Sequence, residues 1–99
     1  MNIKKTFKYS PNFDLKKRSQ KKIKFIVFHY TGMKSDTEAI RRLTSPKSKV
    51  SSHYFIKRNG NIIVLVPDLY TTWHAGKSYW KHYNYLNNTS IGIEISNPG

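Results

Sequence analysis

Residues 23–29 read Ile-Lys-Phe-Ile-Val-Phe-His (IKFIVFH), and this short apolar run limits the folds that the rest of the chain can adopt. β-Branched and aromatic residues dominate the run, which is too short for a typical helix. A run of this kind, without alternation of polar and apolar residues, is typical of a strand covered on both faces. We therefore expect a central strand that ends near His29, where Thr31 and Gly32 break the pattern.

A helix and a hairpin follow that strand. Residues 35–38 (SDTE) have the spacing of a capping box, and apolar residues then recur at helical spacing until the Ser-Pro pair at 45–46. Residues 52–58 and 61–66 are strand-like runs on either side of Asn-Gly at 59–60. Asn-Gly is typical of a hairpin turn in which both central residues take positive φ.

The last part of the chain is first aromatic and then alternating. Residues 68–89 are rich in Tyr, Trp and His, and we expect mostly loop there, with one short helix around 79–83. Residues 90–96 (SIGIEIS) alternate, so their isoleucines face one way while Gly92 and Glu94 face the other.

The order strand, helix, hairpin, loop, strand predicts an α/β fold with a mixed central β-sheet and flanking helices. Only one clear helix is present, so we expect one sheet face to be exposed and apolar. Ninety-nine residues fit one small domain. We expect a basic N-terminal arm over 1–22, with at most one short strand or turn, and a single domain over 23–99.

Composition narrows the chemistry. The chain has no cysteine, which excludes disulfides and thiolate sites, so a metal would bind through imidazole or carboxylate. The net charge is +13, and the first 24 residues carry nine Lys or Arg against one Asp. A basic block can serve as a tail for nucleic acid or an anionic surface. We find no nucleic-acid-binding motif, and the excess of Lys over Arg fits an A/T-rich coding bias, so we expect no nucleic-acid partner.

Membrane and export signals are weak. No run approaches the roughly 20 apolar residues of a membrane span. The charged start at residues 1–5 is not followed by an apolar stretch. We expect a cytoplasmic protein, and periplasmic or phage-lytic use stays open.

Four features could carry chemistry: His29, His53, the Trp73-His74 pair and Glu94. His29 ends a strand, where sites gather in open α/β sheets, although a core histidine with both nitrogens satisfied is the alternative. Glu94 interrupts an apolar strand, so it either faces water or lies on the floor of a cleft that its small neighbours leave open. His53 and the Trp73-His74 pair could contact a substrate or could simply pack.

Four motifs in this order resemble the zinc-dependent N-acetylmuramoyl-L-alanine amidases, which share a fold with peptidoglycan recognition proteins and amidase-type phage lysozymes. The motifs are VFHYTG at 27–32, VSSHYFIKRNGNI at 50–62, TTWHAG at 71–76 and NNTSIGIEI at 87–95. The resemblance covers residues 23–99, and the pairing of WHAG with SIGIE is its most distinctive part.

The resemblance implies particular roles. His29 would be a ligand of one Zn²⁺ ion, and Glu94 would be the general base that activates the zinc-bound water. His53, Trp73 and His74 would line or support the substrate groove. The reaction would be hydrolysis of the amide bond between N-acetylmuramic acid and L-alanine in peptidoglycan or muropeptides, by a monomer.

Two departures from the family pattern matter. Ser52 stands where some members have a catalytic tyrosine, so no tyrosine role is implied. The other two zinc ligands of the family, a His and an Asp or Cys, lie downstream of the SIGIE motif, and this sequence ends at Gly99. Catalytic zinc needs three protein ligands and a water. The resemblance therefore implies an amidase domain truncated at its C-terminus and inactive alone. The alternative is a non-catalytic peptidoglycan-binding module of the same fold.

Overall fold

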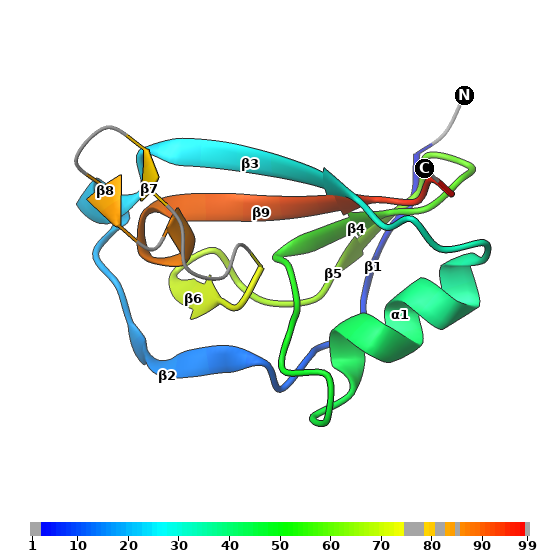
Figure 1. Ribbon diagram of the computed structural model, residues 1–99, viewed down its shortest axis with the longest axis horizontal. Helices are drawn as coiled ribbons and strands as arrows, with labels where there is room; N and C mark the ends of the chain where they lie inside the picture. The colour runs from blue at the N-terminus through cyan, green and yellow to red at the C-terminus, as the bar shows by residue number, and fades with distance from the viewer. Residues whose placement is uncertain (1–2, 75–78, 81–82, 85, 99) are drawn as a thin grey trace.

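The computed structural model describes residues 3–74, 79–80, 83–84 and 86–98, and its main feature is a five-stranded mixed sheet (Figure 1). The strand order is β1-β5-β4-β9-β3. The strands are β1 (Lys5–Phe7), β5 (Ile62–Val64), β4 (Tyr54–Ile56), β9 (Ser90–Ile95) and β3 (Phe25–Tyr30). Only the β4–β5 pair is antiparallel among these neighbours. The predicted α/β fold with a mixed sheet is therefore confirmed.

The first apolar run forms β3, but β3 lies at the edge of the described sheet. It pairs with β9 on one side, and no strand among the described residues pairs with its other side. Ile26, Phe28 and Tyr30 are 62%, 61% and 66% exposed, while the residues between them are half-buried. The prediction of a central strand covered on both faces is thus wrong for the described residues. The expected exposed apolar face is confirmed.

Helix α1 (Asp36–Thr44) covers the opposite face of the sheet (Figure 1). Ser35 Oγ accepts a hydrogen bond from the Glu38 amide at 3.1 Å, which confirms the predicted N-cap, and the helix ends at Ser45. Its buried residues Ala39 and Leu43 pack in one cluster with residues of β4 and β5. The last turn of α1 and the carboxyl-terminal residues of β3 and β9 line one pocket.

The β4–β5 hairpin is confirmed, but its turn is of another type. The Gly60 amide donates to the Lys57 carbonyl at 2.9 Å, and Gly60 has φ 89°. Asn59 does not take positive φ. Its side chain instead accepts from the Asn61 amide at 2.9 Å. This is a type I turn followed by a glycine bulge, which needs positive φ at one residue only.

The basic segment 1–22 is more structured than predicted. It contains β1, β2 (Phe13–Lys17) and the short 3₁₀ helix η1 (Gln20–Lys22). β1 extends the main sheet beside β5, and β2 pairs with β6 (Tyr70–Thr72). The buried side chain of Asn12 donates to the carbonyls of Ser45 and Val50 at 2.8 and 2.7 Å. A segment held by polar side-chain hydrogen bonds shows no hydrophobic periodicity, so its structure could not be predicted from the sequence pattern.

The helix expected around 79–83 is wrong for the described residues of that segment. Residues 79–80 form β7 (Tyr79–Trp80) and 83–84 form β8 (Tyr83–Asn84), an antiparallel pair; residues 81–82 lie outside the described part. Leu86–Thr89 form the 3₁₀ helix η2. No helix in the described ranges has the length and hydropathy to cross a bilayer.

Candidate active site

His29 and Glu94 are neighbours across the β3–β9 pair. They are register partners in adjacent parallel strands, so both side chains point to the face that α1 covers. Both line a pocket of about 170 Å³ between the sheet and the end of α1. The lining of this pocket consists of His29, Tyr30, Thr31, Arg42, Leu43, Val50, Ser51, His74 and Glu94. The structure thus brings together the predicted zinc ligand, the predicted base and His74.

The Glu94 carboxyl is in a partly apolar environment. Burial raises its pKa, and the nearby charges of His29 and Arg42 oppose that rise. A raised pKa makes the carboxylate a stronger proton acceptor, which is the property that a general base uses.

The His74 ring occupies the space beside Gly92. A Cβ atom on residue 92 would lie 2.5 Å from Cγ of His74. The expectation that small neighbours leave open space around Glu94 is therefore wrong at Gly92. His74 Nδ1 lies 3.2 Å from His29 Nε2, and His74 Nε2 lies 2.9 Å from Ser90 Oγ. Burial, followed by the charge of His29, lowers the pKa of His74 to about 3, so the ring is neutral at pH 7.

His53 is fully buried, and its ring centroid lies 6.2 Å from that of the pocket residue His74. Its Nδ1 accepts from the Gly92 amide at 3.0 Å, so Nε2 carries the proton and donates to the Tyr70 carbonyl at 2.7 Å. Arg18 Nη2, 3.3 Å from Nε2, is therefore a second donor and makes a close contact without a hydrogen bond. Burial lowers the His53 pKa to about 4. Because both ring nitrogens are hydrogen-bonded to backbone groups, His53 supports the strands around the pocket. Contact of His53 with substrate stays a prediction.

Trp73, which follows β6, is hydrogen-bonded to a residue of β2. Its indole Nε1 donates to Asp14 Oδ1 at 2.8 Å, and its carbonyl accepts from the Ser51 amide at 3.1 Å. Neither Trp73 nor His53 is among the described residues that line the pocket. The role of Trp73 in substrate binding stays a prediction.

Arg18 is a functional candidate that sequence reasoning missed, and it is nearly fully buried. Its guanidinium donates to the carbonyls of Asp68 and Asn87 at 2.9 Å each. Burial lowers its pKa, and the charge of Asp68 opposes this shift. In the sequence, Arg18 is one cation in a basic run. The one feature that distinguishes it in the sequence is that it is the single Arg among the lysines of residues 1–22.

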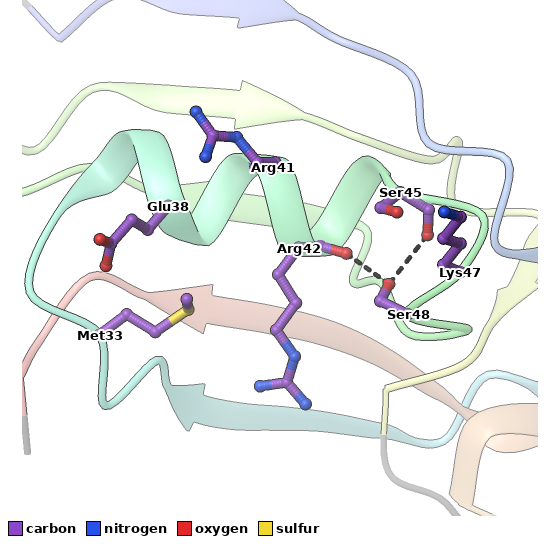
Figure 2. A pocket seen from close by; sticks show the side chains of 7 residues that line it. All are labelled: Met33, Glu38, Arg41, Arg42, Ser45, Lys47 and Ser48. Carbon is purple, nitrogen blue, oxygen red and sulfur yellow. Dashed lines mark hydrogen bonds between the residues drawn. The ribbon is translucent and has the colours of Figure 1, made fainter.

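Arg42 is the second functional candidate that sequence reasoning missed. It lines the pocket of His29 and Glu94, and also a larger hollow of about 440 Å³ along α1. Figure 2 shows the Arg42 side chain extending from α1 toward β9 and β3. The hollow also carries Arg41 and Lys47, against the single carboxylate of Glu38. We refer to this hollow as the α1 groove.

The chain belongs to the N-acetylmuramoyl-L-alanine amidase family, whose profile (Amidase_2) matches residues 19–99. The amidase AmiD of Escherichia coli strain K12 is 42% identical over 85 residues, which are 79% of this chain and 30% of AmiD. The 1,6-anhydro-N-acetylmuramyl-L-alanine amidase AmpD of the same strain is 43% identical over 47 residues, 48% of this chain and 26% of AmpD. The chain thus spans less than a third of the length of these curated relatives.

Solved structures agree with this assignment. E. coli AmiD in complex with anhydro-N-acetylmuramic acid-L-Ala-D-γ-Glu-L-Lys superposes with a TM-score of 0.70 at 38% identity, over 87% of this chain and 36% of that one. A crystal structure of AmpD reaches a TM-score of 0.77 over 98% of this chain and 63% of that one; at 24% identity it supports the fold alone. The family resemblance drawn from the four motifs is confirmed.

The amidase family is generally zinc-dependent. His29 can supply one ligand, because its Nδ1 has no hydrogen bond to any described residue. Among residues 3–74, 79–80, 83–84 and 86–98, no group of three His, Cys, Asp or Glu could hold a metal ion. These residues therefore fit one position of a zinc site and do not complete it.

Proposed function

We propose that this chain supplies the base, and one zinc ligand, of an enzyme that hydrolyses the amide bond between N-acetylmuramic acid and L-alanine in peptidoglycan or muropeptides. One observation carries the proposal: His29 and Glu94 lie side by side on adjacent strands and line one pocket, within the stretch that matches the amidase family. The relative AmiD, an amidase of this specificity by name, supports it.

The chemistry assigned to this chain is proton transfer by Glu94. An amide resists hydrolysis because water is a weak nucleophile and the amine is a poor leaving group. A zinc ion, when bound, acidifies water and polarises the carbonyl. Glu94 takes a proton from the attacking water onto its carboxylate and delivers it to the departing nitrogen of L-alanine. His29 would hold one position on the metal, and further ligands would be needed beyond those that the described residues offer.

The charge of the α1 groove favours an anionic peptide as the substrate. The ligand solved with AmiD contains a γ-linked glutamate, and a γ-linkage leaves the α-carboxylate free. Arg42 connects the pocket to the α1 groove and makes no side-chain hydrogen bond to a described residue. A guanidinium binds a carboxylate through two parallel hydrogen bonds. We propose that the sugar end lies at Glu94 and that the peptide runs into the α1 groove.

The test uses a polypeptide that joins residues 1–99 to the part of E. coli AmiD that follows its matched segment. After loading with zinc, it is incubated with anhydromuramyl tripeptide, and released peptide is measured by mass spectrometry. We expect release by the parent and by Asp68→Asn, which removes a carboxylate outside the pocket, and no release by Glu94→Gln. A substrate whose glutamate α-carboxylate is amidated should be cut more slowly.

Binding separates the two candidate functions. If the zinc-loaded parent leaves the substrate intact while parent and Glu94→Gln bind it equally well, the chain is a non-catalytic peptidoglycan-binding module.

A further inference from the structure

Three hydrogen-bonded side chains lead from the pocket into the interior of the protein. His29 Nε2 lies 3.2 Å from His74 Nδ1, and His74 Nε2 lies 2.9 Å from Ser90 Oγ. The imidazole nitrogens and the hydroxyl can each donate or accept. Which atom donates in each of these hydrogen bonds therefore follows only from a group whose role is fixed.

Ser90, which is fully buried in β9, contacts such a group. Its Oγ also contacts the carbonyl oxygen of Leu86, which can only accept. The single hydroxyl proton of Ser90 is consequently used on Leu86. Ser90 Oγ must then accept from His74, so His74 carries its proton on Nε2.

The proton on His74 Nε2 determines the state of His29. A neutral imidazole with a proton on Nε2 has its lone pair on Nδ1. His74 Nδ1 is therefore an acceptor, and His29 Nε2 must be the donor that reaches it. The lone pair of a neutral His29 is left on Nδ1, the nitrogen without a described partner in the pocket shared with Glu94.

The backbone at Gly92 holds the His74 ring in place. A Cβ atom there would lie 2.5, 2.7 and 2.8 Å from three atoms of the ring, so no other residue type fits without displacement. Gly92 is itself fixed by His53: its amide donates to His53 Nδ1 at 3.0 Å, and its carbonyl accepts from the His53 amide at 2.9 Å. The His74 backbone amide donates to Asn87 Oδ1 at 3.0 Å. The ring is held from several sides.

We propose that His74 is a positioning residue for His29: anchored by Ser90 and Gly92, it holds His29 in the Nε2–H tautomer and leaves Nδ1 as the lone-pair nitrogen beside Glu94. The inference rests on the proposed function only in taking His29 as a site residue. Packing alone would require a ring of this size at position 74, but it would not select a tautomer of His29.

The tautomers are measured on the 99-residue protein by long-range ¹H–¹⁵N correlation of its histidine rings, without metal or substrate. At about pH 8 free histidines are neutral, and protonated and unprotonated ring nitrogens give separate signals. We expect His29 and His74 both as Nε2–H. A wild-type His29 that is mainly Nδ1–H would overturn the proposal.

Ser90→Ala provides the decisive variant. Without Ser90 Oγ, His74 Nε2 has no partner in either tautomer, so the bias of His74 toward Nε2–H is lost and His29 is no longer held as the Nε2–H donor. We expect the tautomer ratio of His29 to change by at least about tenfold. Ser52→Ala is the matched control, because Ser52 is also fully buried and donates to a backbone carbonyl, that of Tyr54. An unchanged ratio in folded Ser90→Ala contradicts the proposal.

Substitution of His74 tests the same point without depending on Ser90. Asn carries an acceptor oxygen near the position of His Nδ1 and should preserve the Nε2–H form of His29. Leu fills similar space without an acceptor, and His29 should then show the ratio of a free histidine. Equal ratios in His74→Asn and His74→Leu would mean that His74 only packs. Failure of the amidase proposal would instead appear as absence of peptide release with these ratios unchanged.

Discussion

At the scale of single residues, Gly92 has no room for a side chain. Gly92→Ala places a methyl group 2.5 Å from the His74 ring, so strand or ring must move. We expect a loss of about 2 kcal/mol in the free energy of unfolding, measured by urea denaturation. Removing the ring should relieve the clash, so Gly92→Ala combined with His74→Ala should cost less than the sum of the two single changes. Additive losses would contradict this contact.

Arg42 and Glu94 are coupled at the same scale. Burial raises the Glu94 pKa, and the charge of Arg42 partly offsets the rise. Arg42→Gln should therefore raise the Glu94 pKa further, as followed by carboxyl ¹³C shifts during a pH titration. Arg41→Gln, one residue earlier on α1, is the control and should leave Glu94 unchanged. Equal shifts in both variants would mean that Arg42 acts only through the overall charge.

At the scale of elements, His53 connects β4, β9 and β6 through its two ring nitrogens. Its folded pKa of about 4 lies below its ordinary 6.5, so the unfolded chain binds more protons between these values. The stability that neutral His53 contributes is therefore present above about pH 6.5 and is lost as the pH falls toward 4. The loss amounts to about 3 kcal/mol.

His53→Gln isolates this contribution, because Gln does not titrate and the other titrating groups are common to both proteins. The free energy of unfolding of the wild type should fall more steeply between pH 6.5 and 4 than that of the variant. Equal slopes in urea denaturation would show that His53 is not a neutral buried link between the strands.

Elements that depend on local chemistry were predictable from the sequence. The N-cap at Ser35, the hairpin about Gly60 and the alternation of β9 each follow from a few neighbouring residues. The edge position of β3 and the strands within residues 1–22 depend on partners far away in the chain, so neither could be predicted from neighbouring residues.

The contacts within the candidate site join residues that lie far apart in the sequence, so local patterns do not predict them. His29 and Glu94 were predicted through the family resemblance, because their approach depends on the register of two strands far apart in the chain. No local pattern connects Gly92 with the ring of His74, since that contact exists only once the loop after β6 lies on β9. Arg18 and Arg42 resemble other basic residues until burial and the pockets distinguish them.

At the scale of the whole molecule, the described residues contain no group of three His, Cys, Asp or Glu that could hold a metal ion, and His29 is the one zinc ligand proposed among them. We expect the 99-residue polypeptide to retain much less than one zinc per chain after dialysis against a weak chelator, because a single imidazole cannot compete for the metal. Metal content measured by atomic emission checks this. Stoichiometric, tightly held zinc would contradict it and would require ligands beyond those identified above.

The most direct test of the amidase assignment is hydrolysis in ¹⁸O-water by the zinc-loaded polypeptide joined to the AmiD segment. We expect free peptide with an L-alanine amino terminus and one ¹⁸O atom in the lactyl carboxyl group of the sugar product, with both products absent for Glu94→Gln. Cleavage at another bond, or undiminished release by Glu94→Gln, would contradict it.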